Sequence, residues 1–393
     1  MLNLPLGIPK DINKYFFNRK KELSQLNNLL VGLHDNVANQ LLVTGYRGVG
    51  KSFLLRKLLN SYSNNVLTAY VDISKIFAIE KGKISEETVL KKMLNEMNNA
   101  LPNKGKLNKI KIIISKLLNK LKNKDYDFKE AGTFLSIPIP DAKDNYQKLA
   151  EFVMEFPQKI VDSYDEIDGF IIVIDEFQLL GELKSPKSFF WLIRSFTQEQ
   201  DNVSYIFTGS TSTTSDMISK LNGVDGAFGM RMLQLNLNPF TESETKNYLN
   251  ERIPEIKFSK DGFKRFYKCT RGFPAYINSF LNVMSKDVNY DEKMIIETFF
   301  FKLDQIAIKW ITAWSTLNLQ EKEVVTIVID NESISWKDLL NKVSYSQGTL
   351  NKILKKLKNK GLIDHFNAKY TVQDYMLKAW LEHRKSEDDY YPI

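Results

Sequence analysis

The chain of 393 residues has little cysteine and histidine and no long apolar run. Its single cysteine, Cys269, has no partner for an internal disulfide, and three histidines are too few for a histidine-rich metal cluster. No run of about 18 apolar residues is present, so no membrane-spanning helix is predicted. The first residues contain Pro5, Gly7 and Pro9 in place of the charged start and apolar core of a signal peptide. We therefore expect a cytoplasmic protein.

Charge is in mild excess, with 55 Lys and Arg against 47 Asp and Glu and a formal net charge of +8. Such an excess favours acidic partners such as nucleic acid, but it is modest for this length. Hydrophobic residues make up 43% of the chain, which is ordinary for a globular protein. The length allows two or three domains. Composition therefore permits DNA binding without predicting it.

A glycine-rich segment between a strand pattern and a helix pattern is the strongest motif. Residues 40–44 form a short apolar run that ends at a glycine, and residues 52–61 are apolar at helical spacing. The segment between them fits G-x-x-x-x-G-K-[ST], the phosphate-binding loop, or P-loop, of nucleotide-binding proteins. The residues predicted to bind the nucleotide here are Gly45, Tyr46, Arg47, Gly48, Val49, Gly50, Lys51, Ser52 and Phe53.

The residue types of this loop suit phosphate chemistry. Glycines allow the backbone to turn its N–H groups toward the phosphates, and the following helix adds the partial positive charge of its N-terminus. Lys51 is predicted to reach the β- and γ-phosphates, and the Ser52 hydroxyl is predicted to ligate Mg²⁺. Lys51 is thereby also a catalytic candidate.

A second apolar strand pattern, residues 169–174, ends in two carboxylates, Asp175 and Glu176. Asp175 is predicted to hold the Mg²⁺ ion, and Glu176 to act as the general base that activates water. A guanine-reading N-K-x-D motif is absent from the sequence, which favours ATP over GTP. The predicted cofactors are therefore ATP and Mg²⁺.

Further motifs surround these two in a defined order. Residues 16–23 (FFNRKKEL) precede the P-loop, and residues 203–210 (VSYIFTGS) form another buried strand pattern. Residues 229–231 (GMR) and 272–274 (GFP) follow. In this order the motifs resemble those of the archaeal-type ATPases of the STAND branch of the AAA+ superfamily, relatives of the origin-recognition initiators. The resemblance covers nearly the whole chain.

The resemblance implies roles for five more residues. Asn18 and Arg19 would lie on the adenine side, and Pro274 would pack near the adenine. Thr208 would be a polar sensor near the γ-phosphate. Arg231 would act as an arginine finger or sensor, and we expect it to act across a subunit boundary, although Met230 departs from the family spacing.

Each of these five roles has a structural alternative. Asn18 and Arg19 can simply form a helix entry, with Asn18 as its N-cap, and Pro274 can simply begin a helix. A threonine that closes a buried strand, such as Thr208, often only satisfies backbone groups. Arg231 can be an ordinary surface arginine.

The alternation of strand and helix patterns predicts an α/β fold with a P-loop parallel-sheet core. We assign this AAA+-like core to residues 1–240, with a helical insertion at about 76–150. Within the insertion, residues 102–124 hold eight lysines and no acid. That segment is predicted to be an amphipathic helix with a solvated lysine face, or alternatively one that contacts a membrane surface or nucleic acid.

Two further domains are predicted after the core. Residues 241–317 have the pattern of an all-helical lid, which begins with a capping box at Thr241 and Glu244. Residues 318–393 show three short helices followed by a hairpin, the pattern of a winged helix-turn-helix. Its third helix, residues 346–360, is the candidate recognition helix and carries Lys352, Lys355 and Lys356.

The predicted function is a Mg²⁺-dependent ATPase switch, in which the lid couples the nucleotide state to the winged helix. One alternative is a DNA-binding initiator or regulator in which ATP is mainly structural. Another is a signalling scaffold that binds protein partners or further copies of itself. The predicted partners are thus ATP, with duplex DNA, a protein or a second copy as the open alternatives.

Overall fold

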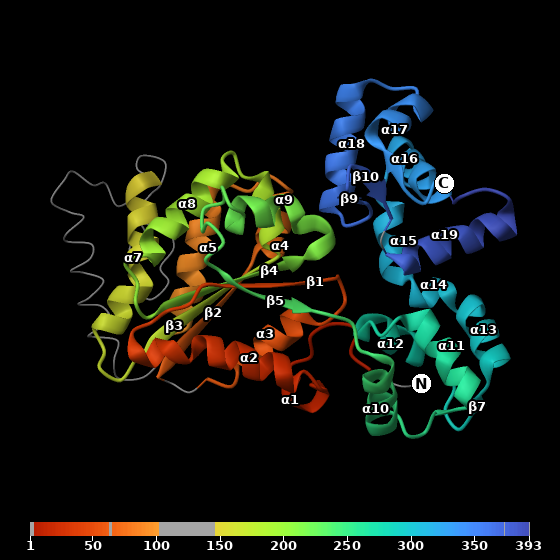
Figure 1. The fold of residues 1–393 in the computed structure, drawn as a ribbon, viewed down its shortest axis with the longest axis horizontal. Coiled ribbons are helices and arrows are strands. Elements are labelled where there is room, and N and C mark those ends of the chain that lie inside the picture. Colours follow the sequence, from red (N-terminus) through yellow and green to blue (C-terminus); the bar gives the residue numbers. More distant parts are fainter. Residues whose placement is uncertain (1–3, 63–64, 102–145, 373, 393) are drawn as a thin grey trace.

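The computed structural model describes residues 4–62, 65–101, 146–372 and 374–392. Figure 1 shows these residues as two bodies side by side, a sheet covered by helices and a helical body that carries a small sheet. We call them the sheet body and the helical body. No helix in the described ranges is long and apolar enough to cross a membrane.

The sheet body is built on five parallel strands in the order β2-β3-β4-β1-β5. The central strands β3 and β4 are buried along their whole length, which agrees with their continuous apolar sequence. Because β4 lies between β1 and β3, the P-loop strand and the Asp175 strand are separated by one strand. The strands are β1 Leu41–Gly45, β2 Val66–Asp72, β3 Gly169–Asp175, β4 Val203–Ser210 and β5 Leu233–Leu237.

Helices cover both faces of this sheet, as predicted for the α/β core. Apolar residues of α2 and α3 form a buried cluster with one face, and those of α4, α5, α7, α8 and α9 form another with the opposite face. The helices are α1 Ile12–Tyr15, α2 Lys20–Leu30, α3 Lys51–Leu59, α4 Ile73–Ile79, α5 Glu86–Asn99, α7 Tyr146–Asp162, α8 Pro186–Thr197 and α9 Thr211–Asn222. The 3₁₀ turns are η1 Val31–Asp35 and η2 Phe177–Glu182.

The predicted insertion at 76–150 is described only at its two ends. Helix α5 buries Val89, Met93 and Met97 in the same cluster as β2 and β3, so this part belongs to the helical layer of the sheet body. Ser85 caps α5 by accepting a hydrogen bond from the Thr88 backbone. The lysine-rich segment 102–124 lies outside the described residues.

The helical body begins with the predicted lid. Its first helix starts at the expected capping box, in which Thr241 and Glu244 bond reciprocally. The all-helical expectation needs one correction, because two segments between helices pair as short parallel strands, β6 Lys257–Phe258 and β7 Asn289–Tyr290. The helices are α10 Glu242–Arg252, α11 Lys260–Thr270, α12 Pro274–Leu281, α13 Glu292–Phe301 and α14 Leu303–Ile306.

The winged helix follows after α15, Ile308–Ser315. Its hairpin gains a third strand, because β10 pairs antiparallel with both β9 and β8. The candidate recognition helix is α18. The elements are α16 Leu319–Asp330, β8 Ile334–Ser335, α17 Trp336–Lys342, α18 Gln347–Asn359, β9 Asp364–Phe366, β10 Lys369–Thr371 and α19 Tyr375–Asp388.

Lid and winged helix share one hydrophobic cluster. It runs from Phe280 in α12 through Trp310 and Trp314 in α15 to Leu350 in α18 and Trp380 in α19. The core is therefore continuous across the boundary predicted near residue 317. We treat the two predicted domains as one packing unit.

Candidate nucleotide-binding site

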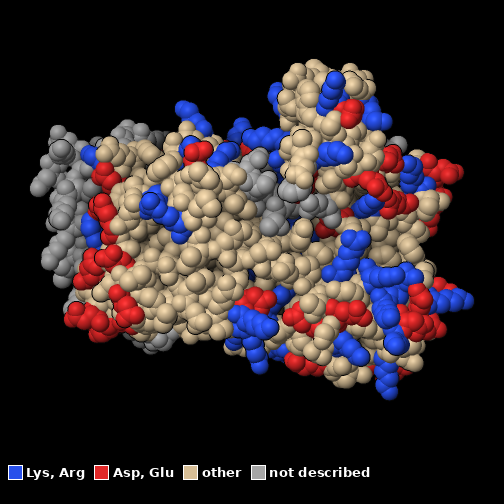
Figure 2. Space-filling model, in the orientation of Figure 1, with Lys and Arg blue, Asp and Glu red and all other residues tan. Residues whose placement is uncertain are grey.

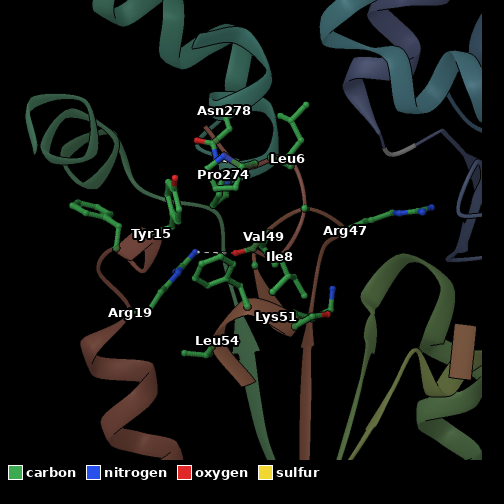
Figure 3. A pocket seen from close by; sticks show the side chains of 18 of the residues that line it. Leu6, Ile8, Tyr15, Arg19, Arg47, Val49, Lys51, Leu54, Pro274 and Asn278 are labelled. Atoms are coloured by element: carbon green, nitrogen blue, oxygen red, sulfur yellow. Dashed lines mark hydrogen bonds between the residues drawn. The ribbon is translucent and has the colours of Figure 1, made fainter. Parts of the chain in front are cut away.

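A cavity of about 340 Å³ lies where the sheet body meets the helical body. This volume is in the range of small-ligand sites. Figure 3 shows the cavity between the P-loop, an N-terminal segment and the start of α12. The P-loop residues that line it are Arg47, Gly48, Val49, Gly50, Lys51, Ser52 and Phe53.

The P-loop backbone requires glycine at its first position. Gly45 has φ +151°, and a Cβ atom there would lie 2.3 Å from the Leu237 carbonyl oxygen of β5. The Lys51 ammonium donates to the carbonyl oxygens of Gly45 (3.0 Å) and Tyr46 (3.1 Å). Burial lowers the pKa of Lys51, and the Glu176 and Asp175 carboxylates oppose that shift. Lys51 is thus held over the loop as a buried cation.

The acidic side of the site joins three elements. The Ser52 hydroxyl donates to Asp175 Oδ2 at 2.8 Å, and the Tyr70 hydroxyl donates to the same oxygen. Burial raises the pKa of Asp175, whereas the bond from Tyr70 lowers it. A hydroxyl and a carboxylate side by side are hard oxygen ligands of the kind that Mg²⁺ prefers. Ser52 and Asp175 therefore fit the predicted metal role.

Glu176 lies next to this pair and lines the cavity. It has a left-handed backbone with φ 55°, and its N–H donates to Asp175 Oδ1 at 2.9 Å. The Gln178 amide donates to the Glu176 carboxylate. The side chain is half-buried, so water can reach it from the cavity. This placement is suitable for a general base.

The opposite end of the cavity is apolar. Residues 5–8 and 15–17 of the N-terminal segment line it together with Phe240 and Tyr248. Asn278 of α12 holds the segment in place by donating to the Pro5 carbonyl oxygen at 2.9 Å. An aromatic and aliphatic wall of this kind suits a planar base.

Asn18 and Arg19 differ in their relation to the cavity. Arg19 lines it, donates to the Asn238 carbonyl oxygen at 2.6 Å and stacks its guanidinium over the Phe240 ring at 4.6 Å. Its weaker bond to the Val49 carbonyl oxygen, at 3.5 Å, is drawn in Figure 3. Asn18 does not line the cavity and donates to Glu244 of α10 at 2.6 Å. Asn18 therefore ties the N-terminal segment to the lid, whereas Arg19 ties it to the end of the core.

Pro274 lines the cavity at the first position of α12, and its predicted packing near the adenine stays a prediction. The turn before it needs glycine, because a Cβ atom on Gly272 would lie 1.8 Å from the Phe240 carbonyl oxygen. The next residue, Ala275, donates its N–H to the Gly48 carbonyl oxygen at 3.3 Å. The lid therefore contacts the P-loop directly at this turn.

Thr208 and Arg231 lie outside the cavity. Thr208 is fully buried on β4, in register with Asp175, and its hydroxyl has no hydrogen-bond partner among the described residues. Ser210, two residues further on, lines the cavity. Arg231 is exposed and precedes β5, whose Leu233 pairs with the start of β1. It thus lies near the end of the strands opposite to the P-loop, and its predicted action across a subunit boundary stays a prediction.

Sequence reasoning missed the apolar wall of this site, Ser210 and two further polar groups, Tyr70 and Lys309. Tyr70 bonds Asp175 from the end of β2, and its position could have been noticed because parallel strands end at one edge. Lys309 of α15 lines the cavity from the helical body, and no motif marked it.

Comparison with known proteins agrees with this geometry. The family model for an ATPase domain predominantly from Archaea matches residues 16–280. The chain belongs to this family. A second model, for a winged helix-turn-helix that binds DNA, matches residues 317–364. The predicted archaeal-type ATPase with a C-terminal winged helix is confirmed, whereas the narrower STAND assignment stays a prediction.

Two solved structures are similar to the ATPase over most of its length. The Walker-type ATPase PABY2304 of Pyrococcus abyssi is 17% identical, with a TM-score of 0.59 over 94% of this chain and 97% of that one. The Orc1 protein of Aeropyrum pernix, solved in complex with DNA, is 14% identical, with a TM-score of 0.50 over 98% and 96%. At such identities the similarity shows the fold alone. Comparison with curated proteins gave no significant match.

Proposed function

We propose that this ATPase binds Mg²⁺-ATP in the cavity and hydrolyses it, and that the nucleotide state sets how the helical body sits on the sheet body. The observation that carries the proposal is the asymmetry of the cavity. One end is mainly aromatic and aliphatic, with Arg19 stacked on Phe240, and the other combines Lys51 with the Ser52–Asp175 pair and Glu176. This division matches a nucleotide, which has a planar base at one end and a charged triphosphate at the other.

Each residue at the charged end has a distinct proposed role. Lys51 and the P-loop amides would stabilise the phosphates, and Ser52 and Asp175 would hold Mg²⁺, which supplies further positive charge at the phosphate oxygens. Glu176 would accept a proton from the water that attacks the γ-phosphorus. The P–O bond to ADP then breaks, and ADP and phosphate leave.

The proposed coupling runs through direct contacts with the P-loop. The lid meets it through the bond from Ala275 to Gly48, and the winged helix meets it through Arg47. The Arg47 guanidinium lies 5.5 Å from the Trp310 ring and donates to the Lys360 carbonyl oxygen at 3.4 Å. A change in the loop on binding or hydrolysis would therefore reach both parts of the helical body.

Turnover and binding measured on two variants test this proposal. Lys51→Ala is expected to lose ATP binding, because the phosphates lose their buried cation. Glu176→Gln is expected to bind ATP with little change but to hydrolyse it about 10²–10⁴-fold more slowly. Isothermal titration and phosphate release measure the two effects. Undiminished hydrolysis by the Glu176→Gln protein would refute the proposed base.

DNA binding is the second candidate function. It is supported by the match of residues 317–364 to a DNA-binding winged helix and by the DNA complex of the similar Orc1 structure. Figure 2 shows Lys and Arg side chains over the winged helix and the lid. On α18, Lys352 is exposed, whereas Lys355 pairs with Glu182 of the sheet body and Lys356 pairs with Glu321. Of these three lysines, Lys352 is the one for which no described residue provides an ion pair, so it is the best placed of the three to meet a phosphate.

A further inference from the structure

Lys309 brings a positive charge into the nucleotide cavity from outside the ATPase domain. It lies in the first turn of α15 and lines the cavity together with Lys51 and Glu176. The ATPase family match ends at residue 280, and the winged-helix match begins at residue 317. Residue 309 thus lies in the connecting segment, which neither match covers.

The charges around the cavity are unbalanced. Among the described residues, four cationic side chains line it, Arg19, Arg47, Lys51 and Lys309, against one carboxylate, that of Glu176. Arg19 is paired with Glu22. For Lys309, no described residue provides a hydrogen bond or an ion pair, and its side chain is accessible to water. An anion in the cavity would therefore find a free ammonium group.

The electrostatic neighbours of Lys309 locate it near the phosphate end. Desolvation by the surrounding protein, followed by repulsion from Arg47, lowers the pKa of Lys309 to about 8, and Lys51 adds to this repulsion. Asp374 and Glu176 oppose the shift. Lys51 and Glu176 are the two groups proposed to flank the terminal phosphate. Lys309 lines the same cavity from α15 and lies within electrostatic range of both groups.

Helix α15 is rigidly joined to the rest of the helical body. Trp310, the next residue, is buried and donates its indole N–H to the Tyr276 hydroxyl of α12 at 2.9 Å. Tyr276 in turn donates to Asp374, which caps α19. A displacement of α15 at Lys309 would therefore also displace the lid and the last helix of the winged helix.

We propose that Lys309 binds the terminal phosphate of ATP. The position of the helical body on the sheet body would then depend on whether that phosphate is present. The inference rests on the proposed function, since it places the triphosphate in the same cavity. Lys51 would hold the β- and γ-phosphates from the P-loop, and Lys309 would contact the γ-phosphate from α15. ADP lacks that group, so it would leave Lys309 without its ligand.

The test is nucleotide selectivity. Affinities for ADP and for the non-hydrolysable analogue AMP-PNP, both with Mg²⁺, are measured by isothermal titration on wild type and Lys309→Ala. The variant is expected to bind AMP-PNP at least about tenfold more weakly, because a charge-assisted phosphate contact is lost. Its ADP affinity should change by less than about twofold. Lys309→Arg, which keeps the charge, should retain most of the preference for the triphosphate.

Two control proteins separate the possible outcomes. Lys337→Ala removes an exposed lysine of α17 and should leave both affinities unchanged. Lys51→Ala should lose both nucleotides. If Lys309→Ala weakens both nucleotides equally, or neither, while Lys51→Ala behaves as expected, the inference is wrong and the proposed function stands. If wild type binds neither nucleotide, both are wrong.

Discussion

The sheet body and the helical body contribute residues to the same cavity from different kinds of structural element. The sheet body contributes the P-loop, Asp175 and Glu176 from the ends of parallel strands that are buried on both faces. The helical body contributes the apolar wall at Pro274 and the cation of Lys309 from helices packed around one aromatic cluster. Under the proposed function, the reacting groups would thus come from the strands of the sheet body, and the helical body would supply groups that sense the nucleotide.

Contacts between the two bodies differ from those within them. Inside each body, large apolar clusters hold the elements together. Between them, most described contacts are polar or involve single rings. They include the bond from Ala275 to Gly48, the bonds of Asn18 with Glu244, of Asn278 with Pro5 and of Arg252 with Lys14 and Phe16, the ring contact of Phe17 with Tyr248, the Arg47 contacts and the exposed ion pair of Lys355 with Glu182. Exposed ion pairs and single hydrogen bonds contribute about 1 kcal/mol or less each. We expect the bodies to separate more easily than either unfolds.

The largest effect is expected from a substitution that creates a cavity in the hydrophobic cluster of the helical body. Phe280 is fully buried in α12, stacked at 5.2 Å from Phe266, and Phe280→Ala is expected to cost about 3–5 kcal/mol. Because lid and winged helix share that cluster, amide hydrogen exchange should accelerate in α11 and also in α16. Exchange in β3 and β4 should stay unchanged.

A matched variant in the other body gives the control. Phe190 is equally buried in α8, 6.2 Å from Phe207 of β4, and Phe190→Ala should accelerate exchange in β4 but not in α16. Faster exchange in both bodies for either variant would show that the molecule unfolds as one unit. Acceleration confined to the lid in the Phe280 variant would show that the winged helix has a core of its own.

The sheet body is also the part that sequence could predict best. Its strands are continuous apolar runs, and the strand pattern predicted at residues 169–174 lies within β3, Gly169–Asp175. The P-loop was recognisable because phosphate binding needs glycine, lysine and a hydroxyl at defined spacing. Local chemistry determines such features, so one sequence suffices to find them.

What escaped prediction depends on tertiary contacts. The strands β6, β7 and β8 have two residues each, too short for an alternating pattern to appear. Lys309 is one lysine among many, and only the packing of α15 directs it to the cavity. The boundary near residue 317 followed a change of pattern along the chain, but the hydrophobic cluster runs across it.

A smaller effect concerns the exposed face of the winged helix. Lys352→Ala is expected to weaken binding to duplex DNA and to reduce the slope of log K against log salt by about one, because one phosphate contact is lost. Lys355→Ala removes a lysine whose partner is Glu182 of the sheet body, so it should leave the slope nearly unchanged. Fluorescence anisotropy between about 50 and 200 mM salt measures both.

Lys356 is not a suitable probe for the same purpose. Its partner Glu321 is almost fully buried, with 2% of its surface exposed, and it completes the capping box of α16. Removing Lys356 would leave a buried carboxylate without its cation and would destabilise the winged helix itself. If the Lys352 and Lys355 variants bind DNA with equal slopes, the exposed face of α18 is not the DNA contact, and a protein partner becomes the better hypothesis.

The smallest expected effect concerns the contact between the two bodies. Arg47→Ala removes the guanidinium that lies over Trp310 and bonds the Lys360 carbonyl oxygen, contacts worth about 0.5–2 kcal/mol. Without nucleotide, hydrogen exchange should therefore rise a few-fold in the last turn of α18. Tyr46→Ala is the matched control, because the neighbouring Tyr46 ring packs on Phe273 of the lid, at 6.0 Å. It should loosen α12 and leave α18 protected. If exchange rises in the same helices for both variants, Arg47 and Tyr46 do not contact the winged helix and the lid independently. The helical body then responds to the P-loop only as a whole.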